Sequence, residues 1–205
     1  MIVKPMIDLQ QRSIEIIKGW QFDGAYAACL SFSQYGYSWL RDGAWIAHGM
    51  AAAGQTSSAR AFYQWGARTL WRYRAQVDSL LAKLARGEAL LESDYLPTRF
   101  KLDGDINQDD WPNFQLDGYG AWLWGLVQFV QAHDDQALWA ETRPAVRLTV
   151  EYLGALWQSP NYDSWEEHRD HIHPSTLAAL YGGFRAVEAQ EAGIVPAGLA
   201  DRIRD

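Results

Sequence analysis

The sequence predicts an all-α fold, and three features of the chain support this prediction. Apolar residues recur at helical spacing along most of the chain, and no alternating pattern long enough for a useful β-strand is present. Glycines and capping residues divide these stretches into segments of helix length. The connections between the segments alternate between short and long, which favours helical hairpins stacked in a ring.

Six helices are expected. The first carries Met6, Leu9, Ile14 and Ile17 in a roughly helical rhythm, and a glycine ends it. The predicted helices span residues 6–18, 42–53, 57–86, 117–132, 142–157 and a last segment that Ser175 opens. Residues 196–205 look like the first turns of one more helix.

Capping residues predict where the middle helices begin. Thr56 or Ser57 can cap the third helix with a side-chain oxygen. Asp117 is expected to cap the fourth. Thr142 is expected to cap the fifth, with Pro144 in its first turn, where the missing N–H has no helical partner to lose.

Composition narrows the class of protein and its partners. The 205 residues, 48% hydrophobic and 21% charged, fit one compact soluble domain. The chain has no uncharged apolar run of about 18 residues, so no membrane span is expected. The N-terminal residues lack the basic and then apolar pattern of a secretory signal, so we expect a cytoplasmic protein. The single Cys29 excludes an internal disulfide. A net charge of −7 without Lys/Arg clusters argues against nucleic acid as a partner.

The long connections between the predicted helices hold three polar and aromatic clusters, and long loops in a compact domain usually carry function. The first cluster contains Tyr35, Tyr37, Trp39, Arg41 and Asp42. An Arg–Asp pair at a helix start offers a rigid donor fork beside an acceptor, which matches two neighbouring sugar hydroxyls. For this pair alone, a helix N-cap at Asp42 paired locally with Arg41 is the simpler interpretation.

The second cluster contains Trp111, Gln115, Asp117 and Gly118. Gln115 and Asp117 can address further hydroxyls, while Trp111 supplies an aromatic wall. Aromatic residues make up 14% of the chain, more than a core of this size requires, and stacking on sugar faces is one use for the surplus. The alternative is an aromatic loop closed by an N-cap aspartate.

The third cluster places two adjacent carboxylates, Glu166 and Glu167, beside Trp165 and close to Asp163. A carboxylic acid pressed against an indole and a second carboxylate is disfavoured as an anion, so we expect Glu166 to hold a proton near neutral pH. A group of this kind can protonate a leaving oxygen, as the general acid of a glycosidase does. Taken alone, an exposed acidic loop is the commoner explanation of such a pair.

Together the three clusters resemble glycoside hydrolase family 15, the glucoamylase, glucodextranase and bacterial trehalase-like group. The family patterns are Y-x-Y-x-W-x-R-D, W-x-x-x-Q-x-D-G and D-x-W-E-E. Their matches here, in the same order and with similar separation, are Tyr35, Tyr37, Trp39, Arg41, Asp42, Trp111, Gln115, Asp117, Gly118, Asp163, Trp165, Glu166 and Glu167. The resemblance covers roughly residues 20–190.

The resemblance implies an (α/α)6 toroid, twelve helices in two concentric rings, of which residues 1–205 would supply about the first six as a partial catalytic domain. It implies that Glu166 is the general acid and that Arg41 and Asp42 grip the terminal glucose. Tyr35 and Trp39 would line the pocket of that glucose. No cofactor or metal is implied.

The resemblance further implies that Trp111 lies near the acid and that Glu167, beside Trp165, touches the neighbouring sugar. The role of Gln115 and Asp117 is open, because it can be structural. Enzymes of this family invert the anomeric centre, and their general base comes from a later loop. We therefore expect the base beyond residue 205, a missing C-terminal half as partner, and an inactive isolated chain.

The function expected on these grounds is hydrolysis of α-glucosidic bonds from the non-reducing end of small oligosaccharides. Two alternatives remain: a sugar epimerase of similar helical architecture that uses His171 or His173 as a proton shuttle, and a non-catalytic sugar-binding half domain. Residues 103–109 imitate a calcium loop but lack its glycine and final acid. His168, His171 and His173 with Asp170 imitate a zinc cluster, and histidines hydrogen-bonded at a helix entry explain them better.

Overall fold

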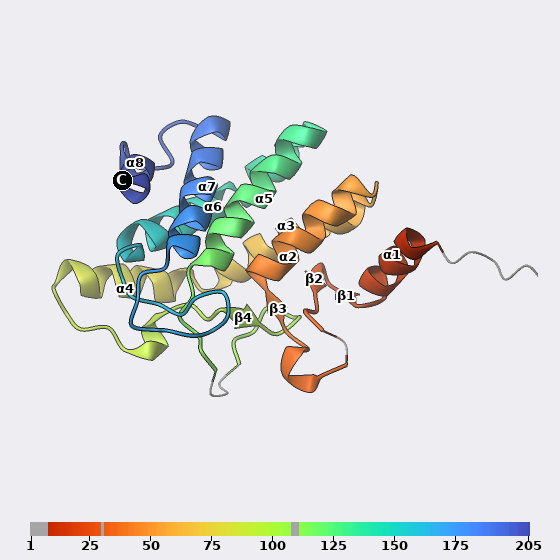
Figure 1. Ribbon diagram of the computed structural model, residues 1–205. Coiled ribbons are helices and arrows are strands. Elements are labelled where there is room, and N and C mark those ends of the chain that lie inside the picture. Colours follow the sequence, from red (N-terminus) through yellow and green to blue (C-terminus); the bar gives the residue numbers. More distant parts are fainter. Residues whose placement is uncertain (1–7, 30, 108–110) are drawn as a thin grey trace, which may run out of the picture.

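The computed structural model describes residues 8–29, 31–107 and 111–205, and this part of the chain is all-α, as the sequence predicts. Met6 of the first predicted helix and Asp109 of the calcium-like loop lie outside the described residues. The α-helices are α1 (Leu9–Gly19), α2 (Leu40–Ala52), α3 (Thr56–Arg72), α4 (Arg74–Ala85), α5 (Asp117–His133), α6 (Gln136–Leu156), α7 (Pro174–Gln190) and α8 (Leu199–Arg204) (Figure 1).

Two antiparallel pairs of very short strands supplement the helices. Strand β1 (Gln21–Phe22) pairs with β2 (Ala25–Tyr26), and β3 (Ser38–Trp39) pairs with β4 (Arg99–Phe100). In the second pair Trp39 lies opposite Arg99. This pairing holds the loop before α2 against the loop before α5.

The helix predicted over residues 57–86 is two helices, because the chain breaks at Tyr73. The amide of Tyr73 donates to the carbonyl of Leu70 at 3.1 Å, which tightens the last turn of α3. The Tyr73 hydroxyl donates to the carbonyl of Gly104 at 3.2 Å and accepts from the amide of Ile106 at 3.0 Å. These tertiary contacts override a continuous helical pattern.

Three predicted caps are wrong. Helix α3 begins at Thr56, so Thr56 and Ser57 are helical residues and the N-cap position belongs to Gln55. Helix α6 begins at Gln136, and the carboxylate of Asp135 caps it by accepting from the amide of Leu138 at 2.9 Å. Thr142 lies inside the helix, where its hydroxyl donates to the carbonyl of Leu138 at 2.8 Å. In α5 the cap position belongs to Leu116, and Asp117 is the first helical residue.

The helices form two packed layers, with the long loops gathered at one end of them (Figure 1). Helix α5 packs against α2 and α7, and α3 packs against α6. Glycines allow the closest of these approaches: a Cβ on Gly120 of α5 would lie 2.6 Å from the carbonyl oxygen of Ala179, and one on Gly183 of α7 would lie 2.6 Å from that of Gly120. The packed layers therefore form a rigid base under the loops.

Part of the aromatic surplus belongs to this core. Trp65, Trp122, Tyr63 and Phe62 are at most 1% exposed. Within the residues described, none of the helices is both long enough and apolar enough to cross a membrane.

Candidate active site

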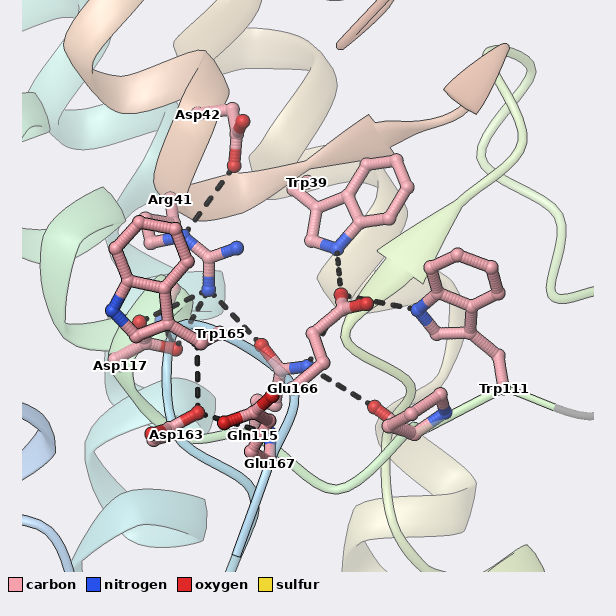
Figure 2. Close-up of polar contacts among 12 residues, drawn as sticks. Trp39, Arg41, Asp42, Trp111, Gln115, Asp117, Asp163, Trp165, Glu166 and Glu167 are labelled. Carbon is pink, nitrogen blue, oxygen red and sulfur yellow. Dashed lines mark hydrogen bonds and ion pairs between the residues drawn. The ribbon is translucent and has the colours of Figure 1, made fainter. Parts of the chain in front are cut away.

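The three clusters found in the sequence meet around one oxygen of Glu166 (Figure 2). Its Oε1 accepts hydrogen bonds from Trp39 Nε1 at 3.1 Å, from Trp111 Nε1 at 3.1 Å and from Gln115 Nε2 at 3.3 Å. Trp39 ends strand β3 directly before α2, whereas Trp111 and Gln115 come from the loop before α5. All three donors are neutral N–H groups. Residues far apart in the sequence thus converge on a single half-buried carboxyl.

Arg41 forms the second centre of the site, next to Gln115. Its Nη1 donates to Gln115 Oε1 at 3.0 Å and to Asp117 Oδ2 at 3.1 Å, and its Nε lies 3.5 Å from Asp42 Oδ2. Gln115 and Asp117 are 1% and 6% exposed. Because Gln115 accepts from Arg41 and donates to Glu166, it links the two centres in one hydrogen-bonded chain (Figure 2).

The surroundings of Asp42 raise its pKa above the ordinary value of 3.8. Burial raises its pKa, the nearby Arg41 lowers it, and the negative charges of Asp117 and Glu166 raise it further. The simpler interpretation of Asp42 holds in part. It does pair with Arg41, but the N-cap position of α2 belongs to Trp39.

An aromatic wall stands beside Glu166. The ring centroids of Tyr35, Trp39 and Trp111 lie 6.0 to 6.1 Å from one another. Tyr35 is 39% exposed and forms the open edge of the wall.

Behind the wall lies Arg99, which the sequence reasoning missed. Its guanidinium carbon is 3.5 Å from the ring centroid of Trp111, 4.2 Å from that of Tyr37 and 5.3 Å from that of Trp39, and the residue is 1% exposed. Its Nη1 donates to the carbonyl of Gln34 at 2.6 Å. A basic residue in an aromatic-rich loop was the one available signal, since nothing local shows that Arg99 is buried.

The acid loop turns sharply, and this turn sends neighbouring side chains in opposite directions. The Asp163 carboxylate accepts from the amides of Trp165 at 2.8 Å and Glu167 at 3.0 Å. Burial alone would raise the pKa of Asp163, but these amide hydrogen bonds outweigh it and lower the pKa. Glu166 adopts a left-handed backbone with φ of 66°.

As a result Glu166 points inward, while Trp165 is 82% exposed and the Glu167 side chain 68% exposed. The expected contact between the Trp165 indole and Glu166 is wrong: Trp39 and Trp111 supply the indoles beside the acid. The acid loop is held in place by the amide of Tyr162, which donates to the carbonyl of Phe114 at 2.9 Å.

A cleft of about 740 Å³ adjoins the site on the Trp111 side. Its walls include Phe114 and Tyr95, whose rings stack at 3.8 Å between centroids, together with Tyr162 and Arg169. Both aromatic faces and polar edges line it, as in a site for a sugar-sized ligand.

Of the histidines near the acid loop, His168 and His171 are exposed and His173 is half-buried. The side chains of His168 and His171 are 67% and 64% exposed. His171 Nδ1 is 2.9 Å from Asp170 Oδ1, and His173 Nε2 is 3.0 Å from the carbonyl of His168. In the described part of the chain no group of three or more His, Cys, Asp or Glu side chains could hold a metal ion.

The two-layered helical fold and a carboxyl surrounded by indoles, an amide and an Arg–Asp pair are typical of enzymes that act on sugars. Residues 12–192 match the model of the family described as "Glycosyl hydrolases family 15". The chain belongs to this family, which confirms the resemblance seen in the sequence and the all-α toroid expected from it.

Individual relatives agree with the family. The chain is 47% identical over 166 residues to an isomaltose glucohydrolase of Kribbella flavida, a match that covers 80% of this chain and 42% of that protein. It also resembles the solved structure of a wild-type glycosidase, with 41% identity and a TM-score of 0.89 over 96% of this chain and 55% of that one. A variant glycosidase in complex with glucose gives 42% identity and a TM-score of 0.90. The chain spans about half the length of the relatives it matches.

Proposed function

We propose that the protein carrying this chain hydrolyses α-glucosidic bonds at the non-reducing end of short oligosaccharides, with inversion and with Glu166 as the general acid. The observation that supports this most directly is the convergence of three N–H groups on Glu166 Oε1. Membership of a glycoside hydrolase family favours hydrolysis over epimerisation. His171 is exposed and His173 is hydrogen-bonded to the carbonyl of His168, so neither supports the epimerase alternative.

The three donors determine which oxygen delivers the proton. In a neutral carboxylic acid one oxygen accepts hydrogen bonds and the other carries the hydrogen. Since Oε1 already accepts from two indoles and one amide, the proton belongs on Oε2, which can donate it to the glycosidic oxygen. Once the proton has left, the same three N–H groups stabilise the carboxylate that forms, at no cost in reorganisation.

The Arg41 centre would hold the terminal glucose. Arg41 is fixed by Gln115 and Asp117, and with Asp42 it offers donors and an acceptor to adjacent hydroxyls. Since Gln115 and Asp117 are almost fully buried, we assign them to positioning Arg41 and Glu166, and not to direct contact with sugar.

The aromatic wall and the cleft would bind the rest of the substrate. Tyr35, Trp39 and Trp111 present ring faces and edges for the terminal sugar, and the cleft beyond Trp111 receives the leaving group. Trp165 and Glu167, exposed beside the acid, are placed to meet the neighbouring sugar at the rim.

An inverting hydrolase also needs a carboxylate that activates water, about 6.5–9.5 Å from the acid. Asp117 is paired with Arg41, and burial raises the pKa of Asp42, so neither suits this role. We propose that the base comes from the part of the relatives that this chain does not cover. Trp45, 58% exposed, forms with Trp124 and His48 an aromatic surface on α2 and α5 that this part would cover.

The experiment uses the full-length protein and a panel of isomaltose, maltose and trehalose, the small substrates expected of a cytoplasmic enzyme. Isomaltose heads the panel because a relative is an isomaltose glucohydrolase. For isomaltose and maltose, proton NMR should show an excess of β-glucose before mutarotation, and the 205-residue chain alone should show no turnover. An early excess of α-glucose from isomaltose or maltose contradicts inversion, whereas trehalose serves only as a test of turnover because its leaving glucose is itself the α anomer. Calorimetric binding without turnover, even with the remaining half supplied, favours a non-catalytic sugar-binding domain instead.

A further inference from the structure

We propose that Arg99 is a positioning residue for the general acid: it holds the indoles of Trp39 and Trp111 so that both N–H groups meet at one oxygen of Glu166. This inference rests on the proposed function of Glu166. It assigns a role to a buried cation that does not itself touch the reacting atoms.

The first support is the place of Arg99 in the fold. Strand β4 sets Arg99 directly opposite Trp39 of β3, and its Nη1 is tied to the carbonyl of Gln34. The backbone position and the side-chain end of Arg99 are thus both fixed by the loop that carries Trp39.

The second support is the stacking geometry. The guanidinium carbon lies 3.5 Å from the ring centroid of Trp111, which is direct contact, and 5.3 Å from that of Trp39. A planar cation stacked on an aromatic face hinders rotation of the ring. Because it also draws electron density from the ring, it makes the ring N–H a better hydrogen-bond donor. At 1% exposure this interaction is not weakened by water.

The third support is convergence. Two indoles from separate loops donate to the same oxygen at the same distance of 3.1 Å, an arrangement that small ring rotations would destroy. The edge-to-face contact of Trp39 with Trp111, 6.0 Å between centroids, leaves both rings facing Arg99. One residue therefore orients two donors.

The test compares two substrates of the full-length protein, one whose leaving group needs a proton and one whose leaving group does not. A disaccharide requires the general acid, whereas an α-glucosyl fluoride departs as fluoride without one. For Arg99→Met we expect kcat on the disaccharide to fall about tenfold, part of the usual worth of a general acid, with a far smaller loss on the fluoride and an unchanged KM. Arg99→Lys, which keeps a cation but not the plane, should be intermediate.

The matched control is Arg74→Met, which removes an exposed guanidinium from the face of Trp71, 5.3 Å from the ring centroid. It should alter neither rate. Equal losses on both substrates for Arg99→Met, or no loss on either, overturn the inference. If Arg99→Met does not fold, the ratio of kcat on the disaccharide to kcat on the fluoride is measured for Arg99→Lys. A ratio equal to that of the unmodified protein overturns the inference.

A second readout does not depend on activity. In the full-length protein, the indole N–H resonances of Trp39 and Trp111 should move upfield in Arg99→Met, while that of Trp139, which donates to Glu191, stays in place. Unmoved resonances of Trp39 and Trp111 contradict the inference. If the unmodified full-length protein hydrolyses neither substrate, the proposed function fails, and these resonances alone decide the role of Arg99.

Discussion

Two clusters in this molecule combine an arginine, a tryptophan and a glutamate, and they differ in what the arginine touches. At the end of α7, Arg143 Nε donates to both oxygens of Glu191 at 2.9 and 2.8 Å, and Trp139 Nε1 donates to Oε2 at 2.9 Å. At Glu166 the arginine lies behind the indole instead, and the described hydrogen bonds to the carboxyl come from neutral groups.

On the proposed function, the difference separates a carboxylate that carries a fixed charge from a carboxyl that delivers a proton. Hydrogen bonds from Arg143, and then from Trp139, lower the pKa of Glu191 to about 2, so this carboxylate stays ionised and ties α6 to the end of α7. A group that delivers a proton has to avoid such a partner. In the active-site cluster the cation acts on the indole, which leaves the carboxyl to neutral donors.

The largest expected effect comes from exchanging each glutamate for glutamine. Glu166→Gln keeps the shape but cannot protonate a leaving group, so we expect kcat on a disaccharide to fall about 10²–10⁴-fold. Glu191→Gln should leave kcat nearly unchanged and lower the melting temperature. Steady-state kinetics and thermal denaturation on the full-length protein measure both. Equal kinetic losses in the two variants would remove the distinction between the clusters.

The tryptophans that donate to the two glutamates provide a second comparison between the clusters. Trp111→Phe removes one N–H donor to the developing carboxylate, a hydrogen bond worth about 1.5 kcal/mol when one partner is charged, so we expect roughly a tenfold loss of kcat. Trp139→Phe removes the equivalent donor at Glu191 and should affect stability alone. An unchanged kcat in Trp111→Phe shows that its N–H contributes nothing to the transition state.

Much of this arrangement could be predicted from the sequence because its signals are local. Helical spacing and caps predict an all-α fold, and three short motifs name the residues that the structure gathers around Glu166. Helix α8, expected as the first turns of a further helix, begins at Leu199. The motifs predict the site residues because each of the three loops leads into the start of a helix, which fixes its position.

The remaining features depend on contacts between distant segments. The break at Tyr73 follows from hydrogen bonds with Gly104 and Ile106, which no helical pattern reveals. Trp165 was expected beside its sequence neighbour Glu166, but the left-handed turn at Glu166 sends the two side chains apart. Arg99 was missed because its burial results from strand pairing and three aromatic rings.

The pH dependence of stability tests the structural cluster. Because the folded pKa of Glu191, about 2, lies below its ordinary value of 4.5, the stabilisation is fully present above pH 4.5 and is lost as the pH falls toward 2. Glu191→Gln should therefore lower the melting temperature by a few degrees at pH 7 and by less at pH 3. Glu15→Gln, which breaks an exposed pair with Arg12, is the control and should show little change at either pH.

Asp42 is intermediate between the Glu191 and Glu166 clusters. Arg41 Nε lies 3.5 Å from its Oδ2, and burial raises its pKa. A folded pKa above the ordinary value of 3.8 means that the contribution to stability is present below pH 3.8 and lost as the pH rises through the folded pKa. Asp42→Asn should then raise the melting temperature at pH 7, where the buried carboxylate is charged, and should give no gain at pH 3. A lower melting temperature at pH 7 would mean that attraction to Arg41 exceeds the cost of burial, and Asp42 would then belong with Glu191 as a structural charge.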